Sequence, residues 1–179
     1  MMADEKKVFS HPLTLRDHMA IAMVKDMNFK PTFEELDGIF VQLGAGHKLI
    51  KGWQNLDYPE WDAADGLPYL DNEVSGIASY HTLDHIDKPI PLLAEIQRVL
   101  KPGGWFVNIV PHYDSELWHA DLTHVSQFAA DTWRNIFSTR HYDHAAVEGH
   151  TEWRFGIEFN MILGFTERNT VLVTKLVKQ

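Results

Sequence analysis

The segment GIFVQLGAG, residues 38–46, decides the fold that the sequence predicts. Residues 38–43 are a short, mostly apolar run with β-branched side chains, which is typical of a buried strand in a parallel sheet. Gly44 and Gly46 let the backbone approach a ligand closely, and free N–H groups in such a turn can bind an anionic or polar end group. Because many tight turns contain Gly-x-Gly, other parts of the chain must decide between a ligand site and a plain turn.

The segments that follow predict strands alternating with covering segments. A proline opens a helix predicted over 89–100, and a Lys-Pro-Gly-Gly segment at 101–104 ends it. The interval between Gly46 and Asp57 is short, so the first helix is expected to be short or absent. This alternation favours a mostly parallel α/β sheet over residues 38–111. Further strands are predicted at 53–58, 74–80 and 105–110.

The C-terminal part of the chain has a different pattern. Residues 112–130 are polar, histidine-rich and irregular, and a short helix is expected at 131–137. Two strand-like segments, 153–165 and 170–177, are separated by a turn-like stretch, which suits an antiparallel hairpin. Together with the preceding strands, this hairpin predicts a Rossmann-like mixed sheet of the α/β class.

The composition excludes several kinds of chemistry. The chain has no cysteine, which rules out disulfides, cysteine-ligated zinc and thiol nucleophiles. A net charge of −9 with scattered lysines and arginines disfavours a nucleic-acid partner, which usually needs a basic face. No apolar run is long enough for a signal peptide or a membrane span. We therefore expect a cytoplasmic protein with a small-molecule substrate and no membrane partner.

Acidic and polar side chains follow the predicted strands. Asp57 ends the second strand, where a carboxylate can accept hydrogen bonds from both ribose hydroxyls of a nucleoside. Asp65 and Gly66 lie in the next loop, and Tyr80 and His81 end the third strand. Ligands of open α/β sheets bind outside the carboxyl ends of the strands, so these side chains are expected at one site.

Taken in order, five motifs resemble class I S-adenosylmethionine-dependent methyltransferases, in particular a group of small ones. The similarity covers residues 41–111. The last motif is the most specific, and the ordered set is far more specific than any member. The motifs are LGAG (43–46), GWQNLD (52–57), LPYLDN (67–72), HTLDHI (81–86) and RVLKPGG (98–104).

The resemblance implies S-adenosylmethionine as the cofactor and assigns roles to the matching residues. The Gly44-Ala45-Gly46 turn would line the methionine end of the cofactor. Asp57 would hold the ribose, with Leu56 or Tyr58 against the adenine.

Further along the chain, the resemblance implies two more groups of contacts. Asp65 would face the adenine amino group, with Gly66 flanking the ring, and Asp62 is the competing candidate for this role. Tyr80 and His81 would lie by the sulfonium and the methyl group.

Polar residues after the last core strand are candidates for catalysis. His112 lies just past the end of that strand. The segment ADLTHV, 120–125, resembles an Asp-Pro-Thr-His segment of some members of the group, with Leu122 at the proline position. A histidine at this edge can act as a general base, so His112, Asp121 and His124 are the candidate catalytic residues. The alternative is that they tie a long loop together by hydrogen bonds.

The many histidines raise the question of a metal site. His81 and His85 are spaced i, i+4, and imidazole and carboxylate groups that are common metal ligands follow the last core strand. No motif such as His-Glu-x-x-His is present, and the resemblance already accounts for the His81/His85 pair. We therefore expect no metal. The later candidates for such a site are His112, His119, Asp121 and His124.

These observations predict an enzyme, an S-adenosylmethionine-dependent methyltransferase with an unidentified, small-molecule acceptor. The alternative is a non-catalytic module that binds S-adenosylmethionine or S-adenosylhomocysteine. Gln42 keeps it open, because glutamine cannot supply the negative charge that the family often places before the turn. Nicotinamide dinucleotide binding is disfavoured, since it needs a longer Gly-x-Gly-x-x-Gly turn that enters a full helix.

The length of 179 residues is that of one ordinary domain, and 45% hydrophobic residues suffice for a core. A helix is predicted at 12–28 from its rough apolar stripe. We therefore expect one methyltransferase-like domain over 1–179. Its parts are an N-terminal helical cap (1–37), a cofactor-binding core (38–111), a substrate-side loop region (112–150) and a C-terminal hairpin (151–179).

Overall fold

The structure is a computed structural model that describes residues 38–47, 49–137, 153–164 and 168–179. The predicted helix at 12–28 and the expected cap at 1–37 lie outside the described residues. The same holds for the end of the loop region, 138–150.

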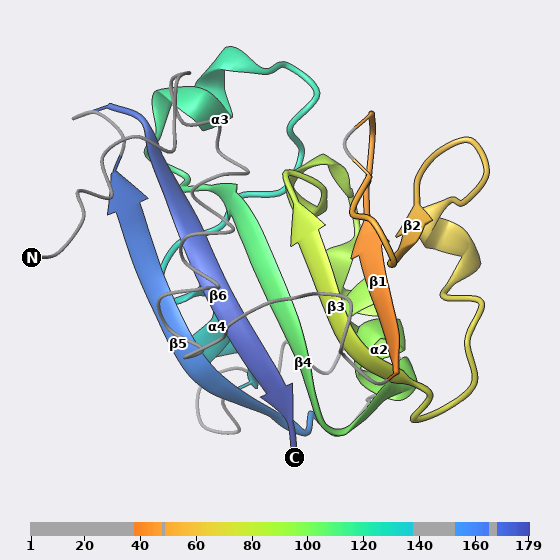
Figure 1. Cartoon of the computed structure of the whole chain (residues 1–179). Coiled ribbons are helices and arrows are strands. Elements are labelled where there is room, and N and C mark those ends of the chain that lie inside the picture. Colours follow the sequence, from red (N-terminus) through yellow and green to blue (C-terminus); the bar gives the residue numbers. More distant parts are fainter. Residues whose placement is uncertain (1–37, 48, 138–152, 165–167) are drawn as a thin grey trace, which may run out of the picture. The chain divides into compact units, whose positions relative to one another are not determined.

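Six strands form one mixed sheet (Figure 1). They are β1 (Ile39–Leu43), β2 (Gln54–Leu56), β3 (Val74–Tyr80), β4 (Leu100–Pro111), β5 (Phe155–Gly164) and β6 (Thr170–Lys178). Their order in the sheet is β2-β1-β3-β4-β6-β5. The first four strands of this order are parallel, and β6 is antiparallel to both β4 and β5. The predicted Rossmann-like mixed sheet with a C-terminal antiparallel hairpin is confirmed.

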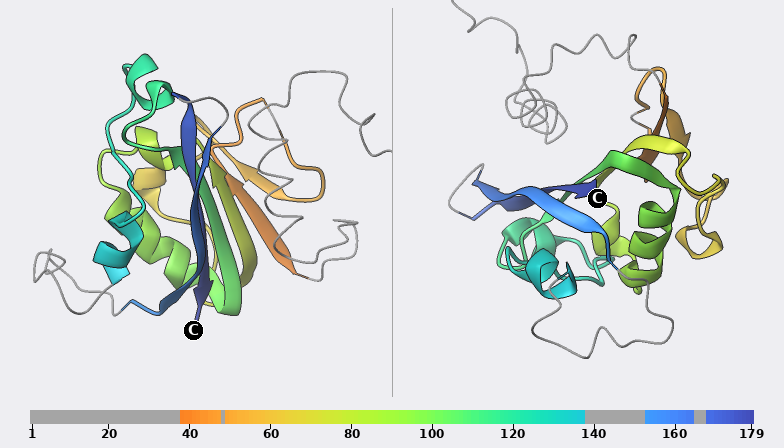
Figure 2. Two further views of the ribbon diagram at one scale, coloured as in Figure 1. Left: turned by 90° about the vertical axis from the view of Figure 1, so that its left-hand side faces the viewer. Right: turned by 90° about the horizontal axis from the view of Figure 1, so that it is seen from below.

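Short helices cover this sheet within the described part of the chain. They are α2 (Pro89–Val99), α3 (Glu116–Ala120), α4 (Thr132–Phe137) and the 3₁₀ turns η2 (Ala63–Asp65) and η3 (Leu83–His85). The helices α2 and α4 lie over the same face of the sheet (Figure 2). Both were predicted, whereas α3 falls in a region expected to be irregular. Its start is marked only by Ser115, whose Oγ accepts a hydrogen bond from Leu117 N at 3.2 Å.

The apolar face of α2 fixes this helix on the sheet. Leu92, Leu93, Ile96 and Val99 recur at helical spacing, and all four are buried. Burial of each such side chain contributes about 1.5–3 kcal/mol to folding. The helix leads directly into β4, so this packing also sets where β4 begins.

The strand β4 begins earlier than the sequence predicts. The segment at 101–104 was expected to end a helix in a turn, and it instead forms an irregularity inside the strand. Val74 pairs with Leu100, whereas Gly76 already pairs with Trp105. Extra residues on one strand are accommodated as a β-bulge, where glycines are tolerated. A Cβ on Gly76 would lie 2.6 Å from the Trp105 ring, so this pairing needs a glycine.

The link between β1 and β2 contains no helix among its described residues, 44–47 and 49–53. This agrees with the expectation of a short or absent first helix. The Asn55 side chain holds the link together, because its Nδ2 donates to Ile50 O at 3.1 Å and to Trp53 O at 2.8 Å. In return, Ile50 N donates to Asn55 Oδ1 at 2.9 Å.

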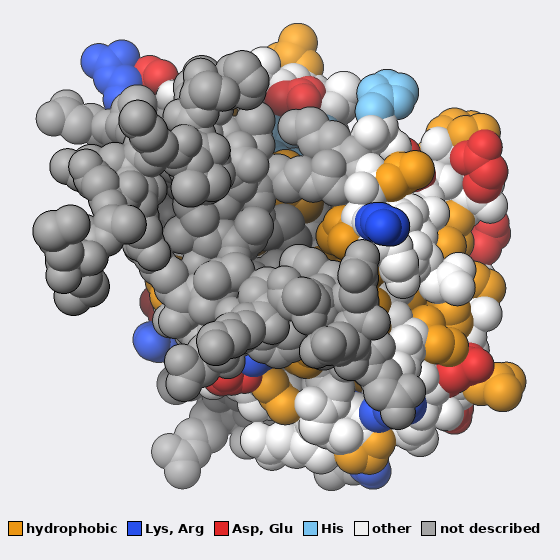
Figure 3. All heavy atoms as spheres, viewed as in Figure 1, with side chains coloured by type: hydrophobic (Ala, Val, Ile, Leu, Met, Phe, Trp, Pro, Cys, Tyr) orange, Lys and Arg blue, Asp and Glu red, His pale blue; other side chains and the backbone are white. Residues whose placement is uncertain are grey.

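The surface of the described residues carries charges of both signs. On the face shown in Figure 3, acidic and basic side chains are spread over the visible described surface. None of the helices in the described part of the chain has the length and apolar character that crossing a membrane requires.

Lys178 links the end of the hairpin to the start of β4. Its Nζ donates to Leu100 O and to Asn72 Oδ1, each at 2.7 Å. Lys178 is buried, and this burial lowers the pKa of its ammonium group. The last strand is therefore held by side-chain bonds as well as by its ladder.

Replacing this lysine tests its contribution. We expect Lys178→Met to lower the free energy of unfolding by about 1–3 kcal/mol, because the buried Leu100 O loses its donor. Urea denaturation measures the loss. The matched control is Lys101→Met, since Lys101 is exposed and its Nζ donates to Ser75 Oγ at a long 3.3 Å. Equal losses in the two variants would contradict this role of Lys178.

Candidate functional site

Four strand ends bring the predicted site residues to one edge of the sheet. The strands β1, β2, β3 and β4 are parallel, so their carboxyl ends lie at the same edge (Figure 1). Ligands of open α/β sheets bind outside this edge. The residues placed there are the Gly44-Ala45-Gly46 turn after β1, Asp57 after β2, Tyr80 and His81 at β3, and His112 after β4.

The turn after β1 needs a glycine at its first position. Gly44 has φ 64°, and a Cβ on it would lie 2.2 Å from Thr82 Oγ1. Thr82 Oγ1 donates to Leu43 O at 3.1 Å, so the threonine that follows β3 packs directly against the end of β1. The close approach of these two strand ends fixes the position of the turn.

Two N–H groups of the turn bind the end of β2. Ala45 N donates to Leu56 O at 3.2 Å, and Gly46 N donates to Asp57 Oδ2 at 2.8 Å. The sequence had suggested that such groups would be free for a ligand. The structure instead uses them to hold Asp57 beside the turn. Among the described residues, the second carboxylate oxygen, Asp57 Oδ1, has no partner.

The loop that carries Asp65 is held by the helix α2. Asp62 caps η2, because its Oδ1 accepts from Ala64 N at 2.9 Å, whereas the Asp65 side chain is exposed. Glu95 Oε2 accepts from Leu67 N at 3.0 Å. These contacts leave Asp65 available for a ligand and give Asp62 a structural role.

Glu95 is itself held by an arginine. Arg98 Nε donates to Glu95 Oε1 at 2.7 Å, and Arg98 also donates to Tyr69 O at 2.9 Å. A Cβ on Gly66 would lie 2.9 Å from Glu95 Oε2, so Gly66 lets the carboxylate approach the loop. The Glu95–Arg98 pair thus fixes the segment 66–69.

His81 has an unusual backbone conformation at the end of β3. Its φ is 47°, which is uncommon for a residue with a side chain and recurs at functional sites. Its N–H donates to Ile109 O at 2.9 Å, and its ring meets the edge of the Tyr80 ring at 4.8 Å. This conformation brings His81 Nδ1 to 3.6 Å from Asp84 Oδ2.

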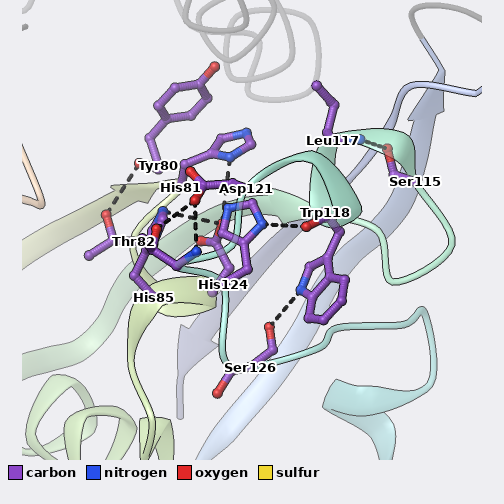
Figure 4. A network of polar contacts seen from close by, with 12 residues as sticks. Tyr80, His81, Thr82, His85, Ser115, Leu117, Trp118, Asp121, His124 and Ser126 are labelled. Carbon is purple, nitrogen blue, oxygen red and sulfur yellow. Dashed lines mark hydrogen bonds and ion pairs between the residues drawn. The ribbon is translucent and has the colours of Figure 1, made fainter.

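Asp84 is a functional candidate that the sequence reasoning missed. Its side chain is 0% exposed, and three imidazoles surround its Oδ2. The nitrogens lie at 2.9 Å (His124 Nε2), 3.6 Å (His81 Nδ1) and 3.8 Å (His85 Nε2). These four residues are called the Asp84 cluster below, and Figure 4 shows its three histidines close together. The signal in the sequence was the spacing of an acid between His81 and His85.

The proton on His124 is assigned by its partner. His124 Nδ1 lies 2.8 Å from Trp118 O, as Figure 4 shows, and a carbonyl oxygen only accepts, so Nδ1 is the donor. A neutral His124 ring therefore presents the lone pair of Nε2 to the carboxylate of Asp84. Two acceptors do not approach to 2.9 Å unless a cation or a proton lies between or beside them.

Thr123 and Asp121 determine which ring nitrogen of His85 carries the proton. Asp121 is exposed, and its carboxylate accepts a hydrogen bond from Thr123. Thr123 Oγ1 gives its one proton to Asp121 Oδ1 at 2.6 Å, so it must accept from His85 Nδ1 at 3.0 Å. The neutral His85 ring then also presents Nε2 toward Asp84.

The three candidate catalytic residues do not form one group. His124 belongs to the Asp84 cluster, where it is buried, and Asp121 reaches the cluster through Thr123. His112 is partly exposed, and its Nδ1 accepts from Asp114 N at 3.5 Å. Within the described residues, no contact joins His112 to the Asp84 cluster.

The core of the chain matches a known family. Residues 36–108 match the family described as the methyltransferase domain. A stretch of 77 residues is 34% identical to the biotin biosynthesis bifunctional protein BioHC of Teredinibacter turnerae. That stretch covers 38% of this chain and 14% of BioHC, so the similarity concerns a small part of that protein.

Solved structures of methyltransferases share the fold. A complex between the Haloferax volcanii Trm112 methyltransferase activator and a methyltransferase matches with a TM-score of 0.62 and 16% identity, over 90% of this chain and 88% of that one. Geranyl diphosphate C-methyltransferase from Streptomyces coelicolor, solved with S-adenosyl-L-homocysteine, matches with a TM-score of 0.55 and 10% identity. The match covers 80% of this chain and 72% of that one. An S-adenosylmethionine-dependent methyltransferase from Thermotoga maritima matches with a TM-score of 0.53 and 17% identity. The match covers 80% of this chain and 83% of that one.

The fold is that of the class I S-adenosylmethionine-dependent methyltransferases, as the motifs predicted. Residues 36–108 match the methyltransferase domain family, and the cofactor of the class is S-adenosylmethionine.

The described residues fit this cofactor. Gly46 is exposed with φ 53°, and a Cβ on it would meet nothing within 4 Å, so the backbone there is open to a ligand. Asp57 offers its second oxygen to a hydroxyl donor beside this opening. Ribose hydroxyls are donors of that kind.

The Glu95–Arg98 pair predicts a dependence of stability on pH. The hydrogen bond from Arg98 is the largest cause that lowers the pKa of Glu95. The ionised form therefore stabilises the fold above the unfolded pKa of about 4.3, and this contribution is lost as the pH falls through the lower folded pKa. We expect Glu95→Gln to lower the free energy of unfolding by about 1 kcal/mol at pH 7, allowing for solvent screening.

Chemical denaturation of both proteins between pH 7 and pH 3 measures this difference. The gap between wild type and Glu95→Gln should narrow as the pH falls from about 4.3 through the lower folded pKa, where the carboxylate becomes protonated in the folded protein as well. Glu60→Gln is the control, because Glu60 is exposed and should show little change at any pH. A gap that stays constant with pH would contradict the assignment.

Proposed function

We propose that this chain transfers the methyl group of S-adenosylmethionine to a small-molecule acceptor at the carboxyl edge of its sheet. The observation that carries the proposal is the pairing of the turn after β1 with Asp57. A carboxylate anchored through one oxygen leaves the other for the cofactor ribose, beside an open backbone at Gly46. The family match over 36–108 supports the same reaction class.

The proposed cofactor site uses the residues that the motifs named. Gly44, Ala45 and Gly46 line the methionine end, and Asp57 with Leu56 holds the nucleoside. Leu56 supports this role because its carbonyl oxygen is bound to Ala45 N, which joins the two parts of the site. When bound, the cofactor supplies an electrophilic methyl group.

Further residues are proposed to contact the adenine and the methyl group of the cofactor. Asp65 and Gly66 face the adenine, supported by the anchoring of their loop on Glu95. Tyr80 and His81 lie beside the methyl group, because they end the strand next to β1 at the same edge.

We propose His112 as the general base that takes a proton from the acceptor. It is partly exposed and follows β4, the strand next to β3, which His81 directly follows. His124 and Asp121 act instead as positioning residues. Both ring nitrogens of His124 are engaged, and Asp121 orients His85 through Thr123.

Cofactor binding tests the role of Asp57. We expect Asp57→Ala to weaken S-adenosylmethionine binding by about 10–100-fold, because hydrogen bonds to a charged acceptor contribute about 1.5–3 kcal/mol each. Isothermal titration calorimetry with S-adenosylmethionine and S-adenosylhomocysteine measures this. Asp87→Ala is the matched control, since Asp87 is exposed and lies outside the motifs assigned to the cofactor. Normal affinity in Asp57→Ala would refute the ribose assignment.

Turnover separates the enzyme from a non-catalytic binding module. With an acceptor found by screening a panel of small molecules, we expect His112→Ala to lower kcat by at least about tenfold, since general bases contribute about 10²–10⁴-fold. The cofactor dissociation constant should stay near normal. His119→Ala is the control, because this histidine is exposed on α3.

Two results would contradict these roles. Unchanged kcat in His112→Ala would show that His112 is not the base. Binding of the cofactor without product on any acceptor in the panel would favour the non-catalytic module.

A further inference from the structure

The Asp84 cluster is the part of the described chain whose charges the proposed function does not explain. In their neutral forms, the rings of His85 and His124 turn an unprotonated Nε2 toward the fully buried carboxylate of Asp84. Asp84 Oδ1 has no hydrogen-bond partner, and neither does the buried His81 Nε2. An arrangement of acceptors around a buried negative charge is unfavourable unless a positive charge lies among them.

We propose that the Asp84 cluster binds one divalent transition-metal ion of the zinc type. The ligand atoms are His81 Nδ1, Asp84 Oδ2 and His124 Nε2, with His85 Nε2 as the fourth. This goes beyond the proposed function, in which His81 lies beside the methyl group and His124 is a positioning residue, because no metal ion has a role there.

The distances from Asp84 Oδ2 to the three histidines are near those between ligands of a tetrahedral site. Zinc bonds of about 2.0–2.1 Å place neighbouring tetrahedral ligands about 3.4 Å apart. The three nitrogens lie 2.9, 3.6 and 3.8 Å from Asp84 Oδ2, on both sides of this value. The ligand atoms of His81, Asp84 and His124 all lie within 4.8 Å of one another. His85 is grouped at this distance with Asp121 and His124, so its side chain must move for all four ligands to surround one ion.

The chemistry of the ligands selects the kind of ion. Three imidazoles and one carboxylate suit zinc, cobalt, nickel or copper, whereas calcium and magnesium prefer oxygen ligands. The buried position of Asp84 and His124 favours a site with four protein ligands over an open, water-filled one.

The hydrogen bonds around the histidines match those of a metal site. Metal-binding histidines usually donate their second ring N–H to a carbonyl or a carboxylate, which fixes the tautomer. His124 donates to Trp118 O in this way. His85 donates to Thr123 Oγ1, which is in turn bound to the carboxylate of Asp121. Both rings therefore aim an unprotonated Nε2 at the same oxygen.

The bound ion would join two segments that are distant in the sequence. His81, Asp84 and His85 lie at the end of β3 and in η3, whereas His124 follows α3. The backbone already links them, because Asp84 O accepts from Val125 N at 2.8 Å. Metal binding should therefore raise the thermal stability of the protein.

Cobalt binding tests the proposal directly. The full chain, freed of metal with a chelator, is titrated with Co²⁺ alone, without cofactor or acceptor. We expect one Co²⁺ per chain with the strong visible absorption of tetrahedral cobalt, displacement by Zn²⁺, and a higher Tm with either ion. Because methyl transfer is not measured, this result and the test of the proposed function can fail independently.

Three variants locate the ion. His85→Ala should weaken Co²⁺ binding at least a hundredfold, and its side chain is 36% exposed, so the fold should tolerate the change. Thr123→Val removes the acceptor for His85 Nδ1 and should weaken binding about 10–100-fold. His119→Ala, an exposed histidine outside the cluster, should bind as the wild type does. Circular dichroism confirms that each variant is folded.

Two outcomes would overturn the proposal. If the wild type shows no tetrahedral cobalt spectrum, the positive charge in the cluster is a proton, and His124 is an imidazolium ion paired with Asp84. If His85→Ala and Thr123→Val bind Co²⁺ as tightly as the wild type, the ion binds to other histidines of the chain.

Discussion

The burial of the Asp84 carboxylate is the constraint on which the described site depends. A charged group removed from water is stable only when its oxygens are compensated by nearby positive charge or donors. This requirement explains why His81, His85 and His124 surround one carboxylate oxygen. It also restricts which of their ring nitrogens carry protons. The backbone carbonyl of Asp84 also accepts a hydrogen bond from Val125 N, in the loop that carries His124. The residue that carries the buried charge therefore also fixes the path of this loop.

The sheet provides the frame in which this charge can be buried. Thr82 packs the end of β3 against the end of β1, and the same strand end carries His81 and Asp84. The turn after β1 and the Asp84 cluster are therefore built on neighbouring strands. A change in the packing of Thr82 would reach both of them.

Much of the fold could be predicted from the sequence, and much less of the site. Buried strands and the helix α2 have a strong apolar pattern, and the glycines of the turn have a local reason to be there. The bulge at 101–104 was not predicted, because a Pro-Gly-Gly run has the same local signature in a turn and in a bulge. The role of Asp84 was also missed, since its burial depends on His124, forty residues away, and no local pattern reports such a contact. Asp57 was placed correctly at the strand end, but its bond to Gly46 required the register of β1 and β2.

The hydrogen bonds between the turn after β1 and the end of β2 affect the thermodynamics of ligand binding. Because Ala45 N and Gly46 N are satisfied within the protein, the turn keeps its shape without a ligand. Little conformational entropy is then lost when a ligand arrives, which is the advantage of a preorganised site. The same bonds also have a cost, because a ligand group that needs these N–H donors must compete with Leu56 O for Ala45 N and with Asp57 for Gly46 N. Affinity at this turn would therefore come mainly from groups that add to the existing bonds and leave them intact.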